Sequence, residues 1–123
     1  MIVKCLMVGI GGFAGSVCRY LISLIPITEK HAFPVKTFIT NILGAFVIGL
    51  IVALALKRPE MNPKTTLLLK TGFCGGFTTF STFALESSDL IGKGQWGVAT
   101  AYMILSVVVC VLAVLAAEAI VGK

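Results

Sequence analysis

Residues 71–83 read TGFCGGFTTFSTF and contain three glycines, four phenylalanines and five hydroxyl side chains, with no charge. A membrane helix usually consists mostly of Leu, Val, Ile and Ala, whereas a segment rich in Gly, Thr and Ser can let its backbone leave helical geometry. Within a bilayer, irregular backbone is tolerated only where protein buries it or a water-filled cavity hydrates it. This segment, bounded by Lys70 and Glu86, is therefore predicted to form a transport site.

The composition of the whole chain indicates that this segment lies in a membrane. Of the 123 residues, 58% are hydrophobic and 12% are charged, and the mean hydropathy is +1.05; a soluble domain carries about 25% charged residues. A membrane-spanning helix needs roughly 20 mostly apolar residues, so four spans would use about 80 to 100 residues. We therefore predict one all-α integral membrane domain over residues 1–123, a four-helix protomer that crosses the cell inner membrane several times.

Four apolar runs are expected to be the spans. The third is expected to be broken near residues 72–80, because the Gly, Phe, Thr and Ser segment lies near its middle. In the first run, Gly11 and Gly15 stand at the GxxxG spacing that permits close helix contact. The expected bounds of the four spans are about 2–25, 35–56, 65–90 and 95–121.

Other function classes find little support in the sequence. The net charge is +5, but no basic cluster exceeds two adjacent residues, so nucleic-acid binding is not expected. His31 is the only histidine, and phosphate-binding glycine loops and nucleophile elbows are absent, so the chain is not expected to be an enzyme. Free buried thiols, rather than metal ligands or disulfides, are indicated by the absence of CxxC spacing among Cys5, Cys18, Cys74 and Cys110.

The signals that orient the chain in the membrane are nearly balanced. Four spans place both termini on one side, which would carry six basic residues against three on the other, or four if Arg19 snorkels there. This weak bias dictates orientation poorly, and we hypothesise that the chain inserts both ways and pairs antiparallel. The six are Lys4, Lys57, Arg58, Lys64, Lys70 and Lys123, and the three are Lys30, Lys36 and Lys93.

The phenylalanines of the central segment have a helical spacing. Phe73, Phe77, Phe80 and Phe83 are separated by four, three and three residues, so a helix would place them along one side. Such a stripe can serve packing alone. Because phenyl rings have an electron-poor edge, rings that line a narrow pore could instead attract a small anion without holding it too tightly.

Two further stripes are polar. Thr37 and Asn41 lie one turn apart in the second span, and Tyr102, Ser106 and Cys110 recur every four residues in the fourth. Either stripe could form hydrogen bonds between helices. Beside a broken third helix, the two could also line a pathway.

Arg19 and Glu86 are charged residues within the expected spans that could take part in transport. Arg19 could snorkel to the interface, or it could face a water-filled vestibule and raise the local anion concentration. Glu86 follows Phe83 by three residues, so a helix would place it near the same face. Helix capping, a salt bridge and a transport role are all open for Glu86.

These features together resemble the Fluc/CrcB fluoride channels. The resemblance rests on GFCGGFTTFSTF shortly after Lys70, Asn41 in the second span, Arg19 late in the first, and about 125 residues in four spans. It implies a dual-topology homodimer in the lipid bilayer whose two antiparallel pores export fluoride passively from the cytoplasm.

The resemblance also implies roles for individual residues. Phe80 and Phe83 would line the pores and Asn41 would donate a hydrogen bond to fluoride. A structural sodium ion at the dimer interface would be held by backbone carbonyls at about Gly75 and Thr78. The polar track would be extended by Ser81, Thr82, Tyr102, Ser106 and Glu86, and Arg19 would be the vestibule arginine.

Two other functions share features with this sequence. A small four-helix multidrug/proton antiporter shares this length, but it needs a carboxylate deep in the first span, and this chain has no acidic residue before Glu29. The second alternative is a membrane assembly or regulatory subunit that transports nothing, in which the small-residue motifs would serve packing only.

Overall fold

The computed structural model describes residues 1–26 and 33–122, and its regular structure there is entirely helical. No strand occurs in these two ranges, so the all-α prediction is confirmed for them. Four residues discussed above lie outside the described residues, namely Glu29, Lys30, His31 and Lys123.

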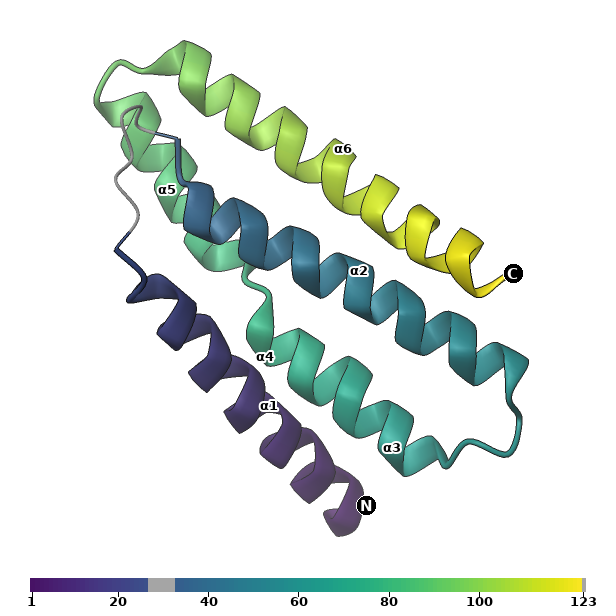
Figure 1. Cartoon of the computed structure of the whole chain (residues 1–123). Coiled ribbons are helices and arrows are strands. Elements are labelled where there is room, and N and C mark those ends of the chain that lie inside the picture. The colour runs from purple at the N-terminus through teal and green to yellow at the C-terminus, as the bar shows by residue number, and fades with distance from the viewer. Residues whose placement is uncertain (27–32, 123) are drawn as a thin grey trace.

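Three long helices form the frame of the molecule (Figure 1). They are α1 (Ile2–Ser23), α2 (Val35–Lys57) and α6 (Trp96–Val121). Each is long and apolar enough to cross a bilayer. They overlap the first, second and fourth expected spans, and each helix end lies within two residues of the expected bound.

The chain between α2 and α6 is divided into shorter elements. It comprises α3 (Pro63–Leu67), the π-helical η1 (Leu68–Cys74), α4 (Gly75–Phe77) and α5 (Phe80–Gly92). The Asn62 side chain accepts a hydrogen bond from the Lys64 N–H at 2.9 Å and so caps the start of α3. No continuous helix covers residues 65–90. Thr78 and Thr79, between α4 and α5, have extended backbone.

Glycines bring α1 into direct backbone contact with η1 and α4. A Cβ atom on Gly11 would overlap the Leu68 carbonyl oxygen, and one on Gly15 would overlap the Phe73 carbonyl oxygen. From the opposite side, a Cβ on Gly76 would lie 2.6 Å from the Gly12 carbonyl oxygen. The close helix contact predicted from the GxxxG spacing is therefore confirmed.

The second close contact joins α2 to α6, which run side by side in Figure 1. A Cβ on Gly49 would lie 2.9 Å from the Ala117 Cβ, and Ala117 is completely buried. At the end of this pair, the Lys57 ammonium donates a 2.7 Å hydrogen bond to the Val121 carbonyl. Such a contact satisfies a carbonyl that the helix leaves without an internal partner.

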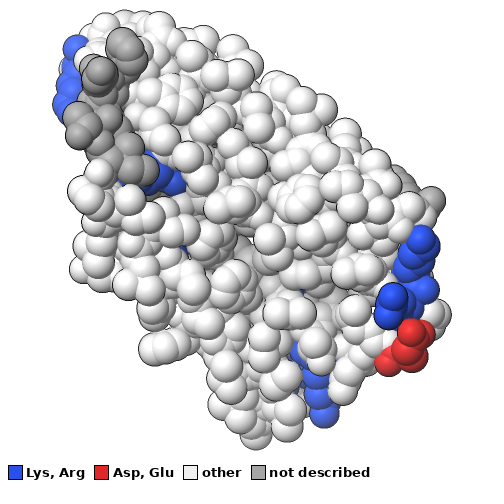
Figure 2. Space-filling view, viewed as in Figure 1, with Lys and Arg blue, Asp and Glu red and all other residues white. Residues whose placement is uncertain are grey.

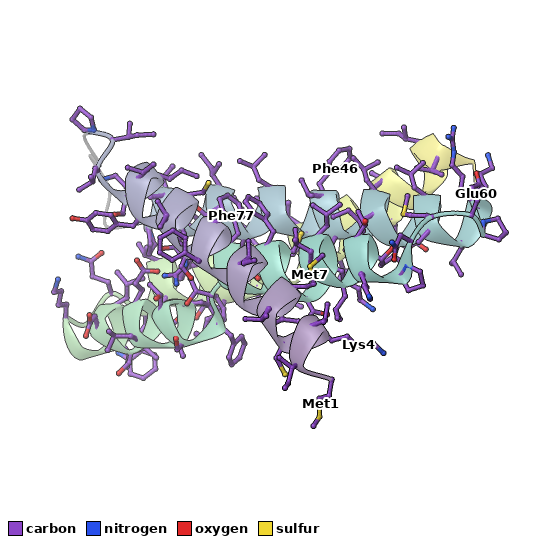
Figure 3. The ribbon with its side chains drawn as sticks, turned by 90° about the horizontal axis from the view of Figure 1, so that it is seen from below. Met1, Lys4, Met7, Phe46, Glu60 and Phe77 are labelled. Atoms are coloured by element: carbon purple, nitrogen blue, oxygen red, sulfur yellow. The ribbon has the colours of Figure 1, made fainter. Side chains whose placement is uncertain are left out.

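The outer surface suits a lipid environment. In the face shown in Figure 2, the charged side chains gather at the two ends of the molecule and a broad uncharged band lies between them. Large apolar side chains are exposed along α1 and α6. Figure 3 shows Lys4 and Glu60 at the edge of the helix assembly, whereas Phe77 is only 8% exposed.

We expect Gly15→Ala to destabilise the protein, because the added methyl group meets the backbone of η1 rather than a side chain that can move. The free energy of unfolding should fall by about 1–3 kcal/mol, the usual cost of overpacking. Thermal unfolding of the purified protein in detergent measures this change.

Gly9→Ala is the matched control, since a Cβ there meets nothing within 4 Å. It should leave stability unchanged or raise it by up to about 1 kcal/mol through helix propensity. An equal free energy of unfolding for the two variants would show that stability does not depend on the close backbone contact between α1 and η1.

Candidate functional site

The extended residues Thr78 and Thr79 are placed by their own hydroxyl groups. The Thr78 hydroxyl donates to the Cys74 carbonyl at 2.8 Å, at the end of the preceding helical turn. The Thr79 hydroxyl accepts a hydrogen bond from the Thr82 N–H at 3.1 Å and so caps α5. One threonine therefore ends a helical segment and the next begins another.

Asn41 of α2 pairs with the backbone of Thr79 in both directions. The Thr79 N–H donates to Asn41 Oδ1 at 2.9 Å, and Asn41 Nδ2 donates to the Thr79 carbonyl at 3.2 Å. One turn later, the absence of a side chain at Gly44 leaves room for the Thr78 methyl group, which a Cβ would overlap. Asn41 was predicted to donate a hydrogen bond to fluoride. Its amide has two N–H groups, and one of them remains for that predicted role beside the bond to Thr79.

Arg19 contacts the backbone of the segment between η1 and α5. Its Nε donates a 3.1 Å hydrogen bond to the carbonyl of Gly76 in α4. This contact links the end of α1 to the segment just before the extended residues. Arg19 also lines a cleft between α1, α2 and α5, and its role as a vestibule arginine stays a prediction.

Glu86 of α5 joins two other helices through hydroxyl groups. It accepts a hydrogen bond from the Thr37 hydroxyl at 3.0 Å and another from the Tyr102 hydroxyl at 2.9 Å. Thr37 belongs to α2 and Tyr102, which is fully buried, to α6. The polar stripes predicted on these two helices therefore meet at one carboxylate.

The four phenylalanines of the segment form two pairs. Phe73 and Phe77 stack with ring centroids 5.7 Å apart, and Phe80 and Phe83 are tilted with centroids 5.6 Å apart. Phe83 also contacts Tyr102 at 5.0 Å. The single helical stripe suggested by the spacing is wrong, because the extended Thr78 and Thr79 separate the pairs. Phe80 is 78% exposed.

A groove of about 630 Å³ lies where α2, η1, α4, α5 and α6 meet. Its lining is mostly apolar, yet the Ser106 hydroxyl is buried there without a hydrogen-bond partner. A buried hydroxyl without a protein partner is free to bind water or a ligand. The predicted site residues that line this groove are Asn41, Gly75, Thr78, Phe80, Phe83 and Ser106.

A second, smaller cleft of about 350 Å³ lies between α1, α2 and α5. Arg19 and Thr82 line it, and so do Lys36 and Thr40, which were not predicted as site residues. Thr79 lines both the groove and the cleft. Thr79 is the N-cap residue of α5. Because Thr is favoured at helix N-caps, the sequence could have indicated that a helix begins after Thr79. The remaining predicted residue, Ser81, is exposed.

The carbonyls of Gly75 and Thr78, predicted to hold sodium, fit a cation site. In a continuous helix they would accept from the N–H groups of Thr79 and Thr82, but these donate to Asn41 and to the Thr79 hydroxyl instead. Both residues line the groove. The described residues contain no cluster of three or more His, Cys, Asp or Glu that could hold a metal ion.

Comparison with known proteins places the sequence in a family. Residues 6–118 match a family model described as CrcB-like protein, Camphor Resistance (CrcB). The chain belongs to the CrcB family. The resemblance drawn from the motifs is thereby confirmed, and with three helices able to span a bilayer this CrcB-family chain is a multi-pass membrane protein.

Curated relatives of this CrcB-family chain carry the name fluoride-specific ion channel FluC. The one from Chlorobaculum tepidum is 50% identical over 98 residues, which cover 80% of this chain and 78% of the relative. The one from Azobacteroides pseudotrichonymphae is 40% identical over 116 residues, covering 94% and 93%. The one from Ruminiclostridium cellulolyticum is 46% identical over 110 residues, covering 87% and 83%.

We expect Asn41→Ala to lower stability, because it leaves the N–H and the carbonyl of Thr79 without their partners. Each unsatisfied buried group costs about 1–3 kcal/mol. Hydrogen exchange at the Thr79 amide should also become faster in detergent-solubilised protein. Asn62→Ala, which removes an exposed cap, is the control and should leave exchange at Thr79 unchanged. Unaltered exchange in Asn41→Ala would remove Asn41 from the support of this segment.

Proposed function

We propose that this chain is a fluoride-selective channel that exports fluoride passively from the cytoplasm. The observation that carries the proposal is the buried, unpartnered hydroxyl of Ser106 in a groove that Phe80 and Phe83 also line. The names of the curated relatives give the ion. No catalytic step is part of this function.

Fluoride is small and strongly hydrated, so it gives up water only where protein groups replace that water. In the proposed path the Ser106 hydroxyl and the free N–H of Asn41 donate hydrogen bonds. The edges of Phe80 and Phe83 add a weak attraction without a formal charge. Conduction needs this balance, because an ion that binds too strongly does not leave.

The polar groups next to the phenylalanines would continue the path. Tyr102 packs on the Phe83 ring and donates to Glu86, and Ser81 and Thr82 lie in the first turn of α5. The Ser81 and Thr82 hydroxyls can turn their hydrogens towards a passing anion. Arg19 would raise the anion concentration in the cleft at the other side of Thr79.

A passive pore is sufficient for export. Hydrogen fluoride crosses membranes as a neutral weak acid and dissociates in the cytoplasm, which traps fluoride there. The negative-inside membrane potential drives the anion outward, with about 2.3 kcal/mol per charge per 100 mV.

The proposal includes a third membrane span, over residues 63–92, that is broken at Thr78 and Thr79. Its support is the close packing of η1 and α4 along the spanning helix α1. A break at membrane depth is tolerable because Asn41 and the threonine hydroxyls satisfy its backbone.

The proposal further includes an antiparallel homodimer with two pores and a structural sodium ion. The balanced basic residues support insertion both ways, and the 78% exposure of Phe80 supports a partner beside the groove. When bound, sodium would supply a fixed positive charge held by the carbonyls of Gly75 and Thr78, since hard oxygen ligands suit a hard cation.

The antiporter alternative finds no supporting feature in α1. Ile2–Ser23 contains no Asp or Glu that could carry a proton through the membrane. A proton-coupled cation flux in liposomes would revive it.

We expect Phe80→Ile and Phe83→Ile each to suppress fluoride efflux from reconstituted liposomes, because an aliphatic side chain fills space without an electropositive edge. Efflux is followed with a fluoride electrode, and chloride release is measured in parallel. Phe13→Ile, a change on the exposed face of α1, should conduct normally. Normal flux in both channel variants, with unchanged elution on size exclusion, would exclude the rings from the mechanism.

We expect Ser106→Ala to reduce fluoride flux while leaving thermal stability unchanged, because the hydroxyl that it removes has no partner in the protein. Ser88→Ala, at an exposed position, is the control for flux. Full flux together with lower stability would assign Ser106 to packing instead.

A further inference from the structure

The carbonyl of Gly76 receives its hydrogen bond from an arginine. In a continuous helix this carbonyl would accept from the N–H of Phe80, four residues later. The extended Thr78 and Thr79 interrupt the helix before Phe80, which begins α5. The Nε of Arg19 donates to the Gly76 carbonyl at 3.1 Å. A side chain of α1 therefore takes the place of a backbone donor at the break.

The short segment between η1 and α5 contacts α1 through one residue and the groove through others. A Cβ on Gly76 would lie 2.6 Å from the Gly12 carbonyl oxygen and 3.1 Å from the Ser16 hydroxyl. Figure 1 shows α4, which contains Gly76, beside α1. Gly75 and Thr78 line the groove. The position of Gly76 against α1 therefore bears on where Gly75 and Thr78 lie.

The guanidinium can hold the backbone and still present its charge to the cleft. The contact with Gly76 uses Nε, which is bonded directly to the aliphatic stem, and it leaves both terminal NH₂ groups of Arg19. The described lining of the cleft contains no acidic side chain that would hold the guanidinium. A hydrogen bond from a charged donor is also roughly twice as strong as one between neutral groups. The bond to Gly76 is therefore the contact that places this side chain.

We propose that Arg19 is a positioning residue for the broken segment. Its Nε holds the Gly76 carbonyl against α1 and thereby keeps Gly75 and Thr78 at the groove. This role is separate from the charge of Arg19, because it needs only a donor at the place of Nε. For the sodium ion the proposal rests on the proposed function: Arg19 would then set the cation affinity of a groove that it does not line.

Two substitutions of Arg19 separate the donor from the charge. Glutamine carries Nε2 directly on Cδ, as arginine carries Nε, so Arg19→Gln keeps a donor at this position without the charge. Arg19→Met keeps the length of the side chain up to that atom and has neither. Arg19→Ala replaces it if Arg19→Met does not elute as a folded protein. Lys57→Met is the matched control, because it removes another hydrogen bond from a cation to a backbone carbonyl, that of Val121.

The first measurement is hydrogen exchange of the full chain in detergent at the amides of Thr78 and Thr79, which donate to the Cys74 carbonyl and to Asn41. Exchange should become about tenfold faster without the donor, the effect of losing one charged hydrogen bond. In Arg19→Gln and Lys57→Met it should stay close to that of the unchanged protein. Slow exchange in the donor-free variant, or equally fast exchange with glutamine, would overturn the proposal. So would an equal rise throughout α6, which would show a general loss of stability.

The second measurement is thermal unfolding at increasing sodium chloride, with N-methylglucamine chloride keeping the ionic strength constant. The sodium concentration for half-maximal stabilisation should rise about tenfold in Arg19→Met and stay unchanged in Arg19→Gln. The same concentration in all three proteins would overturn the link from Arg19 to Gly75 and Thr78. A sodium response missing from the unchanged protein would contradict the sodium site of the proposed function, and hydrogen exchange would still decide the role of Arg19.

Discussion

The reciprocal hydrogen bonds between Asn41 and Thr79 are the interaction on which the site depends. The hydrocarbon core of a bilayer offers no water to an exposed N–H or carbonyl group. An extended residue there therefore needs another protein group that accepts from its N–H and donates to its carbonyl. The Asn41 amide supplies one donor and one acceptor to Thr79. Because Thr79 is thereby held away from helical pairing, the carbonyl of Gly75 loses its usual donor and the two phenylalanine pairs are separated.

Close backbone contacts hold the rest of the segment around this point. The glycines of α1 admit the carbonyl groups of η1 and α4 from one side, and Gly44 of α2 admits the Thr78 methyl group from the other. Glu86 then ties α5 to α2 and α6 through two hydroxyl groups. The segment is thus fixed by small residues where backbones meet and by polar side chains where the backbone is extended.

The sequence was sufficient for the long helices and for the glycine contacts, because hydropathy and GxxxG spacing are local signals. The resemblance to a family named Asn41, Phe80, Phe83 and Ser106, and the structure brings them into one groove; their roles in transport stay predictions. The sequence could not show that Asn41 serves Thr79, since that pairing joins residues 38 positions apart. Periodicity misjudged the phenylalanines for a related reason: a regular spacing assumes one continuous helix, and two extended residues interrupt it.

The double exposure of Thr79, to the groove and to the cleft, has an electrical consequence. Where water fills both spaces, a transmembrane voltage does not fall evenly over the roughly 30 Å of hydrocarbon. In the proposed channel it would drop mainly across the segment around Thr79, which lines both spaces, and the local field there would be correspondingly steeper. An ion would then do most of its electrical work while passing a single residue.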